Sequence, residues 1–280
     1  MTKTVRSLFA TALLMTAGAT SCLAGAWTQP ENGIYDKLGV NIYYASKNFD
    51  RNGNRAEMPG NGTFRDFNLT NYIEYGLTRE LTLINSIPFK VINNSSTTEA
   101  NTTTGVGDID LAARYKLTEG GWGLLSTQAL IKIPWAYDSN ARLPLGNGQG
   151  DYEGKLLYGC SLWRYLPGYV NLELGYRYRA GGPADEFKYL VEFGSDITKS
   201  LYTRLKLDGT MSMDNGARFD YSGNPTTTNN YDLGKLEVTV GYKITPSWGV
   251  ELTYGPALYG QNTAAGATYS FALFYQTPSP

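Results

Sequence analysis

Apolar and polar residues alternate along most of this chain. In 105–117, the odd positions from Ile109 to Leu117 are apolar or aromatic, whereas the even positions carry Asp, Ala, Arg and Lys. The same alternation recurs within 168–181, where the even positions from Val170 to Tyr178 are apolar or aromatic and the odd positions from Asn171 to Arg179 are Asn, Glu, Gly and Arg. Successive side chains of a β-strand point to opposite faces, so each segment has one apolar and one charged face.

The alternation predicts an all-β protein with about twelve strands. A barrel of this kind holds lipid outside and water or ion pairs inside, and its even strand count leaves both ends on one side of the membrane. We therefore predict a transmembrane antiparallel up-and-down β-barrel. Its expected strands span 34–46, 65–76, 81–92, 106–117, 122–136, 151–164, 169–180, 187–196, 200–211, 233–244, 248–258 and 267–276.

The connections between these segments alternate between short turns and longer polar loops, as in outer-membrane barrels. The long loops include 47–64, 93–105 and 212–231. Tryptophans gather at both ends of the strands. At a membrane–water interface, one part of the indole ring contacts lipid and the other contacts water. A soluble β-sandwich or a lipocalin-like barrel would give similar alternation and remains the alternative fold. The tryptophans at strand ends are Trp122, Trp163 and Trp248 at short turns and Trp135 at a long loop.

The N-terminus has the three parts of a secretory signal peptide. Lys3 and Arg6 precede an apolar stretch at 8–19, and Ala24-Gly25-Ala26 forms an A-x-A cleavage site. We expect a signal peptide at 1–26 and a single barrel domain at 27–280. Export then leads to the cell outer membrane. A buried helix is the alternative for this segment.

Cysteine usage agrees with an exported barrel. The chain has 2 cysteines, and Cys22 lies in the leader. Only Cys160 remains, so no intrachain disulfide forms, and we interpret it as a small structural residue. Lipid attachment through Cys22 is an alternative, although no large apolar residue precedes it in the usual position. No later segment offers the ~20 apolar residues of a transmembrane helix.

Charge and composition argue against several functions. A formal net charge of −1 gives no case for nucleic acid as a partner. The chain has no histidine, which removes Ser-His-Asp and Cys-His catalysis and the commonest metal ligand. Asp50-x-Asn52-x-Asn54 starts like a calcium loop but lacks its Gly and its Glu. We therefore expect no enzyme activity, no cofactor and no metal.

The charged face is expected to line the lumen with eleven bases and eleven acids. The bases are Arg114, Lys116, Lys132, Lys155, Arg177, Arg179, Lys188, Arg204, Lys206, Lys235 and Lys243, and the acids are Glu74, Asp108, Asp110, Asp151, Glu153, Glu173, Glu192, Asp196, Asp208, Glu237 and Glu251. A balanced lining suits ion pairs that brace the wall and leave a narrow pore for neutral or zwitterionic solutes. Arg177, Arg179 and Arg204 could form a constriction, since guanidinium groups hold carboxylates and hydroxyl-bearing solutes well. The alternative is that these residues are structural braces. The candidate lining residues are Arg114, Lys116, Glu173, Arg177, Arg179, Lys188, Glu192, Arg204, Lys206 and Asp208.

Several segments resemble a known family. The stretches 71–83, 105–117, 146–159 and 238–255 resemble outer-membrane β-barrels associated with the meta-cleavage pathway of phenol degradation, described as transporters. The resemblance covers most of the mature chain and implies a barrel that passes aromatic or other small organic molecules. It supplies no catalytic residues. Outer-membrane chains often end on an aromatic residue, whereas here Tyr275 is followed by five further residues.

The leading functional hypothesis is a passive outer-membrane channel for small organic solutes, aromatic ones included. Its partners are outer-membrane lipid and a small-molecule solute, and the sequence sets no oligomeric state. The alternative is a non-conducting structural or adhesive barrel that acts through loops 47–64 and 212–231, because loops on a rigid scaffold often carry recognition. Conductance separates the two hypotheses.

Overall fold

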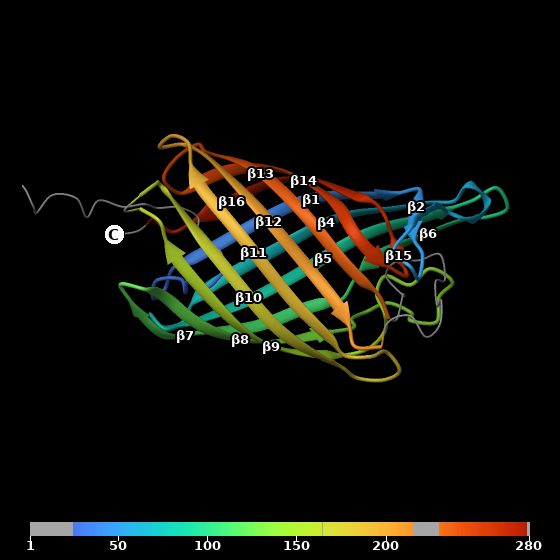
Figure 1. Ribbon diagram of the computed structural model, residues 1–280, viewed down its shortest axis with the longest axis horizontal. Helices are drawn as coiled ribbons and strands as arrows, with labels where there is room; N and C mark the ends of the chain where they lie inside the picture. The colour runs from blue at the N-terminus through green and yellow to red at the C-terminus, as the bar shows by residue number, and fades with distance from the viewer. Residues whose placement is uncertain (1–24, 164, 215–229, 279–280) are drawn as a thin grey trace, which may run out of the picture.

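The computed structural model describes residues 25–163, 165–214 and 230–278 as a long barrel of tilted strands (Figure 1). The predicted strands are present within a few residues of their expected ends. The barrel strands are β1 (Ile34–Ala45), β4 (Thr63–Gly76), β5 (Leu81–Ser95), β7 (Ile109–Gly120), β8 (Gly123–Ile133), β9 (Asp151–Ser161), β10 (Gly168–Arg179), β11 (Glu186–Asp196), β12 (Leu201–Ser212), β13 (Asp232–Lys243), β14 (Trp248–Gln261) and β16 (Ala267–Gln276).

The sheet closes on itself. Each barrel strand pairs antiparallel with its neighbours in the chain, and β1 joins the two ends by pairing with both β16 and β4. Tyr35, for example, faces Gln276 on one side and Glu74 on the other. Closure removes free strand edges, which a membrane-spanning sheet requires. The prediction of an up-and-down barrel of twelve strands is confirmed.

The apolar face of the strands covers the outside of the barrel. Leu174 is 71% exposed and Leu252 is 62% exposed, as expected for side chains that face lipid. Trp122 stacks on Tyr158 at 6.1 Å, and Trp248 meets Tyr275 edge-on at 5.1 Å, both beside short turns. Aromatic pairs at strand ends are typical of the membrane interface. The outer surface therefore carries an apolar band, which aromatic side chains border at the short-turn end.

The loop end contains structure that the alternation did not predict. β6 (Ala100–Val106) pairs with the outer part of β5, so the expected loop 93–105 is largely a hairpin. Threonine favours strands, which accounts for a strand in this polar segment. Within the expected loop 47–64, β2 (Lys47–Phe49) and β3 (Arg55–Glu57) form a small sheet with β15 (Thr263–Ala264), and η1 (Pro59–Asn61) follows.

The strand expected at 122–136 ends earlier than predicted, at Ile133. Proline has no backbone N–H to donate, and Pro134 follows immediately. Trp135 therefore lies beyond the strand, where it is exposed. From here the chain turns back, and Leu143 and Leu145 join a buried cluster with Phe64 and Ile92 of the barrel wall. This apolar cluster occupies part of the barrel at its loop end.

Two predicted segments lie largely outside the residues that the structure describes. The expected signal peptide lies outside the described residues except for Gly25 and Ala26, and so does most of the expected loop 212–231. Among the described residues, none belongs to a helix with the length and apolar character needed to cross a bilayer.

Candidate functional site: the barrel lumen

Every candidate predicted from the sequence lies on the inward parity of its strand. On β7, the outward neighbours Leu111, Tyr115 and Leu117 are exposed, whereas Arg114 between them is 4% exposed. The same contrast holds along β10 and β12, where apolar side chains point out and charged ones point in. The strand period alone therefore places these groups inside the barrel.

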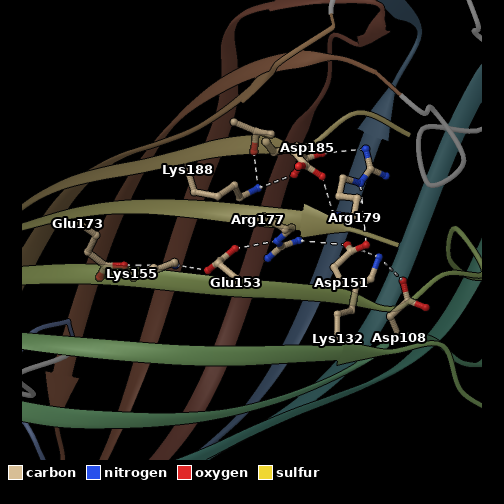
Figure 2. A network of polar contacts seen from close by, with 12 residues as sticks. Asp108, Lys132, Asp151, Glu153, Lys155, Glu173, Arg177, Arg179, Asp185 and Lys188 are labelled. Carbon is tan, nitrogen blue, oxygen red and sulfur yellow. Dashed lines mark hydrogen bonds and ion pairs between the residues drawn. The ribbon is translucent and has the colours of Figure 1, made fainter. Parts of the chain in front are cut away.

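A continuous chain of ion pairs runs along the inner face of β8 to β11 (Figure 2). Lys132 Nζ lies 2.6 Å from Asp151 Oδ2 and 3.6 Å from Asp108 Oδ2. Arg177 Nε donates to Glu153 Oε2 at 2.7 Å, and Lys155 bridges Glu153 and Glu173 at 3.1 and 3.3 Å. We call this group the ion-pair wall: Asp108, Lys132, Asp151, Glu153, Lys155, Glu173, Arg177, Arg179, Glu186 and Lys188.

The loop-side end of the wall is the most buried part. Arg179 Nη1 lies 3.0 Å from Glu186 Oε1, and both side chains are almost fully buried. Lys188 Nζ approaches Glu186 Oε2 at 3.7 Å. Asp185 in the following loop accepts a hydrogen bond from the Arg179 backbone N–H at 2.9 Å and another from the Tyr176 hydroxyl. These hydrogen bonds hold the pKa of the Asp185 carboxyl below its usual range.

The three arginines proposed as one constriction lie at two levels. Arg177 and Arg179 end β10 at the loop side. Arg204 lies near the start of β12, at the short-turn side, where its Nη2 is 2.7 Å from Glu251 Oε1. The structure therefore separates Arg204 from the other two, and each arginine is engaged by a carboxylate.

Within the described part of the chain, four more charged residues face the lumen that the sequence analysis did not place there: Lys37, Asp66, Lys90 and Glu186. Lys37 approaches Glu251 at 3.7 Å, Lys90 pairs with Asp66 at 2.9 Å, and Glu186 belongs to the ion-pair wall. Their parity along β1, β4, β5 and β11 was a sufficient signal. Two are acids and two are bases, so the expected balance of charge is unchanged.

The opposite side of the lumen carries a row of uncharged polar side chains. Five successive strands, β4, β1, β16, β14 and β13, place one such residue at the same register position. Asn41 Nδ2 donates to Asn68 Oδ1 at 2.8 Å, and the hydroxyls of Thr239 and Thr253 lie 2.7 Å apart. We call this row the uncharged belt: Asn68, Asn41, Ser270, Thr253 and Thr239.

Between these regions lies a short apolar row that also faces inward. Ile84, Ala112 and Leu130 are direct register neighbours on β5, β7 and β8. Leu130 and Leu190 of β11 border the same two cavities. Apolar side chains in a polar lumen offer contact area to the carbon skeleton of a solute.

Part of the N-terminal segment, residues 25–29, lies inside the barrel at its short-turn end. Ala26 N–H donates to Asn171 Oδ1 at 3.0 Å, and the Ser126 hydroxyl donates to Ala26 O at 2.6 Å. Arg114 Nη1 donates to Trp27 O at 2.8 Å while its Nη2 lies 3.2 Å from Glu74 Oε1. Inward side chains of several strands thus fix this segment across the lumen. After the expected cleavage behind Ala26, Trp27 and Gln29 would still narrow the passage, since the Gln29 N–H donates to Thr82 Oγ1 at 2.8 Å.

Three adjoining cavities follow the lumen. Their volumes are about 330, 300 and 570 Å³. The first lies at the loop side beneath 145–147, and the largest reaches Gly25 and Asn171 at the short-turn side. Neighbouring cavities share lining residues, among them Asp110, which borders all three. The interior is therefore hollow over much of its length rather than filled by its own side chains.

Loop 134–150 forms part of the boundary at the loop side. The Tyr137 hydroxyl donates to Asp108, and Lys132 Nζ donates to Asn147 Oδ1 at 2.5 Å. Burial and the contact with Asp108 raise the pKa of Tyr137. The loop is thus attached to the ion-pair wall by polar contacts.

No family model matches this chain, and no curated protein matches it. Solved barrels do. An outer membrane channel from Pseudomonas putida F1 aligns with TM-score 0.72 and 16% identity, over 91% of this chain and 99% of that chain. The KdgM porin aligns with TM-score 0.50 and 8% identity, over 86% and 98%. The NanC porin aligns with TM-score 0.50 and 10% identity, over 86% and 100%. These likenesses, together with the apolar exterior, identify an outer-membrane barrel fold.

Proposed function

We propose that this protein is a passive outer-membrane channel for small organic solutes, aromatic ones included, and that it is not an enzyme. The observation that carries the proposal is the series of adjoining cavities along the lumen, from the loops to the short turns. A barrel that served only as a scaffold would have no need of an internal passage. The similar solved barrels are named as an outer membrane channel and two porins, which supports the same function.

The lining favours small organic molecules over ions of one sign. Acids and bases face the lumen in equal numbers and are mostly paired with one another, so neither cations nor anions meet a strong excess of opposite charge. The apolar row of Ile84, Ala112 and Leu130 gives an aromatic ring a dry surface beside these charges. The proposed link to aromatic compounds rests on this row and on the family resemblance.

Single-channel recording with matched probes tests the proposal. Benzenesulfonate and methanesulfonate carry the same charged group and differ by the aromatic ring. We expect discrete openings, with more frequent current blocks from benzenesulfonate than from methanesulfonate. Leu130→Asn should reduce this difference, whereas Leu174→Asn on the lipid face serves as the position control. Equal blocking by both probes would contradict a preference for aromatic solutes.

A second candidate is recognition through the loops. The small sheet of β2, β3 and β15, together with the buried side chains of Met58, Leu143 and Leu145, gives the loop end a fixed shape. Such a surface suits binding of a ligand from outside the cell. Inserted protein that shows no openings would favour this function over the channel.

A further inference from the structure

The uncharged belt offers a binding track for hydroxyl groups. Its five residues occupy one register row across β4, β1, β16, β14 and β13, and all of them border the largest cavity. The row continues to Lys90 of β5 at one end and to Arg204 of β12 at the other. Lys90 lies in the loop-side half of its strand, whereas Arg204 lies beside a short turn. The belt therefore descends obliquely through the lumen, as strand tilt requires.

Space is open beside the belt. The next inward positions along β1 and β16 are Gly39 and Ala272, which have little or no side chain. A Cβ placed on Gly39 would meet no atom closer than 3.6 Å. Both residues border the largest cavity together with the belt. A molecule in that cavity can thus approach the amide and hydroxyl groups directly.

The belt has the hydrogen-bonding chemistry that an uncharged solute needs. A hydroxyl group donates or accepts as it rotates, and an amide does both at separate atoms. Belt residues also bond only locally, as Asn41 does with Asn68 and Thr239 with Thr253, so lone pairs and protons remain for a guest. By contrast, charged groups across the lumen are engaged by their partners, and a guest that binds there has to compete with an ion pair.

We propose that the belt binds uncharged, hydroxyl-bearing organic solutes during passage, which names a substrate class for the proposed channel and rests on that function. A solute with several hydroxyl groups exchanges its water for Asn41, Ser270 and Thr253 in turn. Each contact is weak, and successive sites of similar strength let a solute enter without trapping it. The carbon skeleton faces the open side of the cavity.

Liposome swelling tests this proposal with mannitol and gluconate as probes. The two have the same carbon skeleton, but gluconate carries one carboxylate. We expect the wild-type protein to pass mannitol faster than gluconate. The triple variant Asn41→Leu, Thr253→Val, Ser270→Ala removes hydrogen-bonding groups at similar volume. It should slow mannitol roughly threefold to tenfold, the equivalent of one or two lost hydrogen bonds, while KCl conductance stays close to the wild-type value.

Matched controls locate the effect. Thr127→Val and Thr203→Val remove outward hydroxyls that bond only to backbone carbonyls, and they should leave mannitol flux unchanged. If the triple variant does not fold, as judged by heat-modifiable mobility on gels, Ser270→Ala alone should still slow mannitol relative to wild type. Unchanged mannitol flux in a folded, conducting variant would overturn the belt as a binding track. Absence of conductance in the wild-type protein would instead overturn the channel function itself.

Discussion

The two sides of the lumen have the same strand backbone but differ in the chemistry of their inward side chains. On β8 to β11, charged side chains hold one another across neighbouring strands, as Glu153 does with Arg177 and Lys155. On β13, β14, β16, β1 and β4, one inward register row, the uncharged belt, carries no charge and opens onto the largest cavity, although charged residues such as Lys37 and Glu251 lie elsewhere on the same strands. Charges inside a barrel are tolerated because they are paired or hydrated. The comparison teaches that abundant charge in a lumen need not mark the place where a solute binds.

The largest effect is expected from breaking the ion-pair wall. Glu153→Gln leaves Arg177 and Lys155 without their shared carboxylate. Removing one partner of a fully buried pair costs about 3–5 kcal/mol. Water in the lumen should reduce this to roughly 2 kcal/mol, measured as the free energy of unfolding in urea and lipid. Glu57→Gln breaks an exposed pair with Lys47 and should cost at most about 1 kcal/mol. Equal losses would remove the distinction between wall and surface.

Removal of the wall's arginines should change ion selectivity. Arg177→Ala with Arg179→Ala leaves Asp151, Glu153 and Glu186 with fewer bases nearby. The lumen then carries excess negative charge, so the reversal potential in a KCl gradient should shift toward that of the cation. Arg177→Gln alone should give a smaller shift of the same sign if the double variant folds poorly. An unchanged potential would mean that ions pass elsewhere.

The N-terminal segment lies in the lumen itself, so its removal tests what limits the width of the passage. Trp27 packs edge-on against Tyr169 at 5.5 Å and lies over Gly159 inside the short-turn end. Trp27→Ala removes this side chain from the passage. We expect a moderate increase in single-channel conductance, by a factor of about two at most, because pore width limits flow. Trp163→Ala, on an exposed ring at the same end, should leave conductance unchanged.

The smallest effect on stability is expected from the uncharged belt. Thr253→Val removes the 2.7 Å hydroxyl contact with Thr239 and leaves no charge unpaired. The expected loss is about 0.5–1.5 kcal/mol, measured in the same urea titration as Glu153→Gln. A loss as large as that of Glu153→Gln would show that the belt is also a structural brace.

Strand parity was sufficient to predict the barrel and most of its lining. Alternate residues of β7 and β10 are exposed on the lipid face as the strand period requires: Leu111, Tyr115, Leu117, Leu172, Leu174, Tyr176 and Tyr178. The uncharged belt was missed because its members form one row only after five strands pair in a particular register. Register depends on contacts between strands distant in sequence, so a single segment does not reveal it.

The loop end and the N-terminal segment escaped the sequence analysis for related reasons. The pairing of β2 with β15 joins residues 47–49 to 263–264, which no local pattern predicts. Trp27 and Gln29 lie inside the barrel through hydrogen bonds with Arg114 and Thr82, which are far away in the chain. Parity placed Arg204 on the inward face but could not show that it lies toward the short-turn end, whereas Arg177 and Arg179 lie at the loop-side end.

The reversal potential of the refolded protein in a planar bilayer, under a KCl gradient, tests the central claim most directly. If the lumen is a water-filled passage whose charges are balanced and mutually paired, discrete openings will appear and the reversal potential will lie close to zero. A correctly inserted barrel without openings, or a reversal potential close to that of one ion, would contradict this account.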